Sequence, residues 1–134
     1  MLEKIEHIGI AVKDAKSSVA LFNALFNREP LKTETVTSES VTTIFYQLGE
    51  SKIELLEATS EDSTIARFIE KRGEGIHHIA FAVDNLETEI ERLKTAGFQF
   101  IHDAPKDGAD NKRICFLHPK SGNGILIELC EERK

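Results

Sequence analysis

Two short segments of the chain, Glu6–Val12 and His77–Val83, alternate between bulky and small side chains. An alternation with a period of two predicts β-strands in which each face carries one kind of side chain. The bulky faces carry Ile8, Ile10 and Val12 in the first strand and His77, Ile79, Phe81 and Val83 in the second. The small faces carry His7, Gly9 and Ala11 in the first and His78, Ala80 and Ala82 in the second. We expect the bulky faces to pack against helices and the small faces to leave room for a ligand.

A helical pattern follows each of these strands. Asp14 precedes one helix and Asp84 the other, and Gly97 is a plausible C-cap of the second. The apolar positions that recur at helical spacing are Val19, Leu21, Phe22, Leu25 and Phe26 in the first helix, and Leu86, Ile90, Leu93 and Ala96 in the second. A short connecting helix is predicted over Ser63–Arg72, with Gly73 closing it.

Three further strands are predicted after each helix. They are Leu31–Thr37, Val41–Leu48 and Lys52–Ala58 in the first half of the chain, and Phe98–His102, Lys112–His118 and Gly124–Cys130 in the second half. The strand and helix that open each half align at an offset of 71, so that His7 matches His78 and Val12 matches Val83, and Glu54 matches Glu128 at an offset of 74. The pattern predicts an α+β fold of two tandem βαβββ modules, residues 1–60 and 74–134, joined by a helix within residues 61–73. We expect one domain of 134 residues.

Composition narrows the class of protein. With 40% hydrophobic and 30% charged residues, the chain is typical of a soluble globular domain. The net charge of −6 argues against nonspecific nucleic-acid binding. We find neither a signal peptide nor an apolar run near the ~20 residues that span a membrane. Cys115 and Cys130 fit reduced thiols, so we expect a cytoplasmic protein without membrane or nucleic-acid partners.

Two histidines and two glutamates form the candidate site. His7 and His78 occupy the same register on the small faces of their strands, whereas His77 lies on the bulky face and is interpreted as structural. Glu54 and Glu128 each lie between apolar neighbours, where a carboxylate is costly unless it is paired or bound to a cation. The set suits Zn, Co, Ni, Mn or Fe(II). The alternative is that both glutamates lie on strands that are only half buried.

These four residues in tandem βαβββ modules resemble the vicinal oxygen chelate superfamily, which includes the glyoxalases, bleomycin resistance proteins and dioxygenases. The segments "IEHIGIAVKD", "GEGIHHIAFAVDN" and especially "HPKSGNGILIEL" are similar to those of the methylmalonyl-CoA epimerases. The resemblance implies an open sheet, or partial barrel, around a divalent metal ion (Co, Zn, Mn or Ni), usually in a homodimer. His7, His78 and Glu128 match metal positions of the family, and Glu54 matches a position that holds glutamine or glutamate.

The resemblance also implies an activity, the interconversion of (2R)- and (2S)-methylmalonyl-CoA by removal and return of a proton. Inversion needs two acid/base groups on opposite faces. In the family the metal-bound glutamate of the last strand, here Glu128, is one of them. The usual position of the second corresponds to Ser38, and Glu39 lies one residue nearer to the following strand. Glu39 is therefore the predicted second base. The alternative is that Glu39 is an ordinary solvated residue of the loop.

An acyl-CoA substrate needs a surface that accepts phosphate groups. The segments "PKDGADNKR" and "HPKSG" supply a local basic cluster, and the predicted substrate-binding residues are Lys106, Lys112, Arg113, Lys120 and Ser121. A solvated charged loop is the alternative for each lysine.

Three other functions fit the same superfamily. A glyoxalase I would use the same four kinds of ligand, and an extradiol dioxygenase would use a 2-His-1-carboxylate site and leave Glu54 spare. A metal-free binding protein needs an aromatic groove, but the chain has no Trp and one Tyr.

Overall fold

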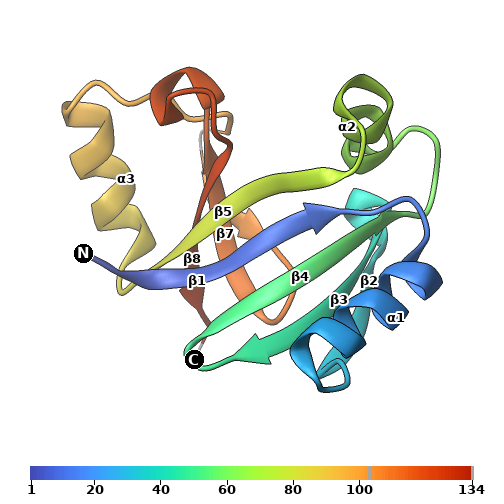
Figure 1. Cartoon of the computed structure of the whole chain (residues 1–134). Helices are drawn as coiled ribbons and strands as arrows, with labels where there is room; N and C mark the ends of the chain where they lie inside the picture. The colour runs from blue at the N-terminus through green and yellow to red at the C-terminus, as the bar shows by residue number, and fades with distance from the viewer. Residues whose placement is uncertain (103, 134) are drawn as a thin grey trace. The chain divides into compact units, whose positions relative to one another are not determined.

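The computed structural model describes residues 1–102 and 104–133, whose helices and strands are drawn in Figure 1. The chain divides into two compact units. Unit 1 comprises Met1–His7 and His78–Lys134, and unit 2 comprises Ile8–His77. Strands β1 (Leu2–Ala11) and β5 (Gly75–Val83) each continue from one unit into the other. As a result, the first histidine of the repeat belongs to the same unit as the second.

In unit 2 the strands follow the order β2-β3-β4-β1. β2 (Lys32–Val36), β3 (Val41–Leu48) and β4 (Ser51–Ala58) are antiparallel neighbours. A single 3₁₀ turn, Thr37–Glu39, connects β2 to β3. Gly49 has a φ of 63°, a left-handed conformation that suits the tight turn between β3 and β4.

Two helices cover the sheet of unit 2. α1 (Ala15–Phe26) begins after Asp14, whose side chain accepts a hydrogen bond from the Lys16 amide, as an N-cap does. α2 (Thr64–Arg72) begins after Ser63, which caps it in the same way, and ends at Gly73. One core cluster consists of Val12, Ile44, Tyr46 and Leu55 with Ile10, Val19, Phe22 and Phe26 packed against it. The other consists of Ala11, Val41, Leu56 and Ile65.

In unit 1 the strands follow the order β1-β5-β8-β7-β6. β8 (Ile127–Glu132) runs parallel to β5, and β7 (Lys112–Leu117) runs antiparallel to β8. β6 (Lys106–Asp107) is a short edge strand, and a 3₁₀ turn over Pro119–Gly122 precedes β8. This pairing places Glu128 between Ala80 on one neighbouring strand and Phe116 on the other.

The two faces of the unit 1 sheet differ in what they pack against. Helix α3 (Leu86–Thr95) covers one face of the sheet. The hydrophobic core between this helix and the sheet consists of Val83, Leu86, Ile90, Leu93, Cys115, Leu117 and Leu129, with Phe81 packed against it. The opposite face carries Ala80, Ile114 and Cys130 with Phe116. The bulky faces of both histidine strands therefore pack against helices, as predicted.

The α+β class and the βαβββ order of each half are confirmed. One detail of the second half was predicted wrongly. Residues Phe98–His102 form only an isolated bridge from Phe100 to Leu117, because the chain bends after it and regular pairing resumes at Lys106, beyond Pro105. Asp84 precedes α3 as predicted, and the N-cap is the next residue, Asn85, whose side chain accepts a hydrogen bond from the Thr88 amide.

Several predicted strands are shifted at their ends. β8 begins at Ile127 and not at Gly124, which has a φ of 88° and still belongs to the preceding turn. β7 stops at Leu117, because His118 caps the 3₁₀ turn that follows. Among the described helices, none has the length and apolar content needed to cross a membrane.

Candidate metal centre

Three of the four predicted metal ligands lie together in unit 1. One ligand atom from each of His7, His78 and Glu128 lies within 4.8 Å of the others, and all three side chains are buried. They come from β1, β5 and β8, respectively. His78 shares a strand face with Ala80, the residue opposite Glu128, so the register of β5 and β8 directs both side chains to the face not covered by α3.

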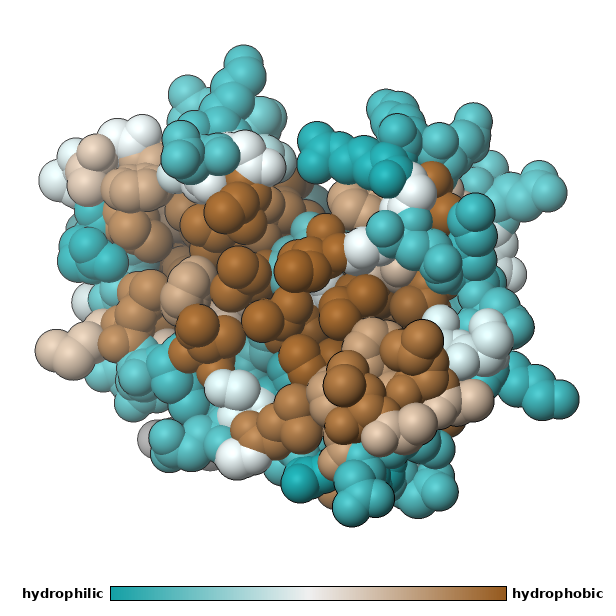
Figure 2. All heavy atoms as spheres, viewed as in Figure 1, coloured by the Kyte–Doolittle hydropathy of each residue, from teal (hydrophilic) through white to brown (hydrophobic). Residues whose placement is uncertain are grey.

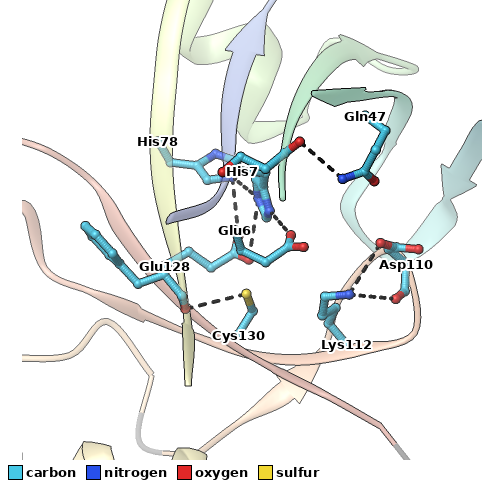
Figure 3. Close-up of polar contacts among 10 residues, drawn as sticks. Glu6, His7, Gln47, His78, Asp110, Lys112, Glu128 and Cys130 are labelled. Atoms are coloured by element: carbon cyan, nitrogen blue, oxygen red, sulfur yellow. Dashed lines mark hydrogen bonds and ion pairs between the residues drawn. The ribbon is translucent and has the colours of Figure 1, made fainter. Parts of the chain in front are cut away.

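The ring nitrogens and the carboxylate converge (Figure 3). The Nε2 atoms of His7 and His78 are 3.0 Å apart, and the two rings meet edge to face. Glu128 Oε1 lies 3.3 Å from His78 Nε2, and its Oε2 lies 3.7 Å from His7 Nε2. Two imidazole nitrogens and a carboxylate oxygen that meet at one point form a donor set that fits Zn, Co, Ni or Mn.

Burial controls the electrostatics of the cluster. The pKa of the Glu128 carboxyl is raised, because burial disfavours its charged form, and the nearby charge of Glu6 raises it further. Electrostatic interactions with His7, Lys106 and Lys112 act in the opposite direction and lower this pKa. A buried carboxylate beside two imidazoles is a site that a divalent cation would stabilise.

Glu6 is a site residue that the sequence reading missed. Alternation along the strand placed it on the bulky face, opposite to His7, but its side chain is buried and its Oε1 lies 2.7 Å from His7 Nδ1. Glu6, His7 and Cys130 form a second group of potential ligands in unit 1. The sequence does contain a signal for this role of Glu6, because in "IEHIGIAV" its carboxylate is directly beside His7, a predicted ligand.

The remaining predicted ligand, Glu54, belongs to unit 2, where it lies on β4 opposite Phe45. Glu54 and Glu128 are only 4% and 5% exposed, so the alternative of two half-buried glutamates is wrong. The assignment of Glu54 as the fourth ligand stays a prediction. Glu39, the predicted second base, ends the 3₁₀ turn after β2 and is partly exposed, and its role also stays a prediction.

The predicted substrate-binding residues have different surroundings within unit 1. Lys106 Nζ lies 5.9 Å from the centre of the Phe116 ring, and Lys112, which is mostly buried, lies 3.4 Å from an Asp110 oxygen. Arg113, on the other face of β7, forms ion pairs with Glu87 and Glu131. Lys120 is exposed, and the Ser121 hydroxyl accepts a hydrogen bond from the Gln99 amide.

His77 has the surroundings of a structural residue. In unit 2 its ring packs edge to face against Phe68, with the ring centres 5.0 Å apart. Burial lowers the pKa of His77 from 6.5 to about 4, so the ring is neutral at physiological pH. This agrees with its predicted position on the face opposite to His78.

Comparison with known proteins identifies the family of this chain. The model of the glyoxalase/bleomycin resistance protein/dioxygenase superfamily matches residues 6–116. An ethylmalonyl-CoA/methylmalonyl-CoA epimerase of Cereibacter sphaeroides is 39% identical over 96% of this chain and 98% of its own length.

Solved structures agree with this relationship. A hypothetical protein from Bacillus halodurans has a TM-score of 0.95 and 46% identity, covering 98% of this chain and 95% of its own. A Streptomyces coelicolor methylmalonyl-CoA epimerase variant, solved in complex with 2-nitronate-propionyl-CoA, has a TM-score of 0.92 and 33% identity over the whole of both chains. The chain belongs to the glyoxalase/bleomycin resistance protein/dioxygenase superfamily and, within it, to the family of the methylmalonyl-CoA epimerases.

Proposed function

We propose that the protein is a metal-dependent epimerase that interconverts (2R)- and (2S)-methylmalonyl-CoA. The observation that carries this proposal is the buried cluster of His7, His78 and Glu128 in a chain of this family. The cluster lies on a sheet face lined by small and apolar side chains, Ala80, Ile114 and Cys130, and not against a helix.

The reaction removes the proton of the carbon between the thioester and the carboxylate. When bound, a divalent metal ion supplies a Lewis acid that stabilises negative charge developing on the substrate oxygens. His7, His78 and Glu128 would hold this ion, and we propose Glu54 as the fourth ligand. Co, Zn, Mn and Ni all suit nitrogen and oxygen ligands of this kind.

We assign proton transfer on one face of the substrate to Glu128. A general acid/base works best when its pKa lies close to the working pH. In the metal-free protein burial raises the pKa of the Glu128 carboxyl, whereas a bound cation would favour its ionised form, the form that accepts a proton. We assign the opposite face to Glu39, the acidic residue of the turn Thr37–Glu39.

The phosphate groups of the CoA part of the substrate need positively charged side chains to bind them. Lys106 and Lys112 are the best supported contributors, since both lie close enough to Glu128 to lower its pKa. Lys120 and Ser121, in the 3₁₀ turn before β8, complete the proposed set. Arg113 is the weakest member, because its guanidinium already pairs with two carboxylates.

We also propose a homodimer. The outer side of α1 exposes Leu21 and Leu25, 60% and 67% accessible, and hydrophobic side chains gather over the region of this helix in Figure 2. Exposed apolar patches of this kind favour protein–protein contact. Sedimentation analysis of the wild type and of a Leu21→Lys/Leu25→Lys variant tests whether this face carries the interface.

A substrate comparison tests the proposed function. The metal-free protein, prepared with a chelator, is reconstituted separately with Co, Zn, Mn and Ni, and is offered methylmalonyl-CoA or the hemithioacetal of methylglyoxal and glutathione. We expect turnover of the CoA ester only, and only with metal. Turnover of the hemithioacetal alone would indicate a glyoxalase, and failure to bind any of the four metals would contradict the metal site.

A further inference from the structure

We infer that Glu6 is a positioning residue that holds the His7 ring in one tautomer and so directs the His7 Nε2 lone pair into the metal cluster. This inference rests on the proposed function, because it concerns the same site. It adds a residue outside the four proposed metal ligands, and we assign its action to its hydrogen bond with His7 Nδ1.

The distances assign a role to each ring nitrogen. Glu6 Oε1 lies 2.7 Å from His7 Nδ1, a short distance for a hydrogen bond of this type. An ionised carboxylate has no proton to donate, so the proton of this bond belongs to Nδ1. In a neutral imidazole the other nitrogen is then the one with the free lone pair.

That other nitrogen is the one at the cluster. His7 Nε2 lies 3.0 Å from His78 Nε2 and 3.7 Å from Glu128 Oε2. The tautomer that Glu6 selects is therefore the one in which His7 can bind a metal ion through the atom facing the other ligands. Histidines that bind metals generally donate their second ring N–H to a carboxylate or carbonyl in this way.

The position of Glu6 in the chain makes the contact unusual. Neighbouring residues of a strand normally point to opposite faces, yet the side chains of Glu6 and His7 lie within hydrogen-bond distance of each other. Both side chains are only 6% exposed, which leaves them few other orientations. A buried carboxylate is costly unless it is hydrogen-bonded, and the bond to His7 Nδ1 meets that requirement.

Two measurements test this role, and the first needs neither metal nor substrate. Proton–nitrogen NMR of ¹⁵N-histidine-labelled, metal-free protein reports which nitrogen of His7 carries the proton, with the His7 signals identified from a His7→Gln variant. We expect the Nδ1–H form in the wild type and its loss in Glu6→Leu. In Glu6→Gln the amide oxygen can still accept the bond, so we expect the Nδ1–H form to persist.

The second measurement is the zinc dissociation constant by competition with a chelating dye. Glu6→Leu should weaken zinc binding about 10- to 100-fold, the usual range when a partner of a metal ligand is lost, and Glu6→Gln should recover part of it. Glu89→Gln is the matched control, because Glu89 is another buried carboxylate of unit 1, bonded instead to Arg92 and to the N-terminal amine. We expect zinc affinity and the His7 tautomer to be unchanged in this control.

The outcomes separate this inference from the proposed function. An unchanged His7 tautomer in folded Glu6→Leu overturns the role of Glu6 whatever the enzyme does. Equal loss of zinc affinity in Glu89→Gln overturns it as well, because the effect would then be general. A wild type that has the Nδ1–H tautomer but binds no metal would contradict the proposed function and leave the Glu6–His7 interaction supported.

Discussion

His7 and His78 lie 71 residues apart in the chain, yet their Nε2 atoms are 3.0 Å apart. Each histidine lies at the same place in its copy of the repeat, and the two strands that carry them, β1 and β5, are hydrogen-bonded neighbours in unit 1. Two nitrogens that face each other at this distance cannot both keep a proton between them. The arrangement is stable if one accepts from the other, or if both bind a cation.

Metal binding should therefore depend on one of the two adjacent histidines and not on the other. His78→Ala should abolish stoichiometric metal, because it removes a ligand atom from the centre of the cluster. His77→Ala should retain the metal, because the His77 ring packs against Phe68. Metal content after gel filtration, measured by mass spectrometry, checks both variants. Equal loss of metal in the His78→Ala and His77→Ala variants would show that the assignment of strand faces is wrong.

Glu128 is predicted to serve both the metal and the proton transfer. Glu128→Gln keeps an oxygen for the metal but cannot carry a proton. We expect some metal to remain and epimerisation to fall by at least ~10², the scale for loss of a general acid/base. Glu89→Gln serves as the control for loss of a buried glutamate. Near-normal turnover of metal-loaded Glu128→Gln would remove Glu128 from the mechanism.

The repeat explains why much of this site could be predicted from the sequence. Alternation assigned His7 and His78 to one face, and the apolar neighbours of Glu128 indicated that its carboxylate is buried, as the structure confirms. Both features are local, because side-chain direction in a strand has a period of two.

What could not be predicted depends on contacts between distant segments. The side chain of Glu6 bonds to that of its own neighbour, His7, a contact that a period of two does not predict. The segment Phe98–His102 has the composition of a strand, but hydrogen bonds on both sides of Phe100 hold it only briefly against β7 before the chain bends away. Where a strand of this kind begins and ends depends on pairing partners that are far apart in the sequence, and not on intrinsic strand preference alone.

Glu39 is predicted to carry the proton on the face opposite to Glu128. Glu39→Gln should then block inversion while Glu128 continues to remove and return the proton on its own face. The signature is incorporation of solvent deuterium into a single enantiomer without formation of the other, followed by NMR and chiral analysis. Glu34→Gln is the matched control, since Glu34 is the other acidic residue of the segment leading to this turn. Inversion by Glu39→Gln at the wild-type rate would place the second base elsewhere.

His77 should make stability depend on pH. Its pKa is about 4 in the folded protein against 6.5 for an ordinary histidine, because burial disfavours the charged ring. Between these pH values the unfolded chain binds more protons, so the free energy of unfolding should fall as the pH is lowered from about 6.5 to 4. The loss that His77 contributes should reach up to about 3 kcal/mol.

Denaturant unfolding of wild type and His77→Gln at several pH values checks this, with a chelator present in all samples. The metal ligands contribute equally to the pH dependence of stability in both proteins, so their contribution cancels when the two free energies of unfolding are subtracted. We expect the wild type to lose more stability than the variant across this range. Parallel pH profiles would show that His77 is not buried in its neutral form.

The central claim is that this chain inverts methylmalonyl-CoA by exchanging the proton between the thioester and the carboxylate. The most direct measurement mixes the metal-loaded wild type with pure (2S)- or (2R)-methylmalonyl-CoA in heavy water and follows deuterium at carbon 2 and the ratio of the enantiomers. The account predicts that both enantiomers reach the same equilibrium mixture, with deuterium incorporated as inversion proceeds, and that a chelator stops both processes. Absence of inversion from either enantiomer in protein that contains stoichiometric metal would contradict it.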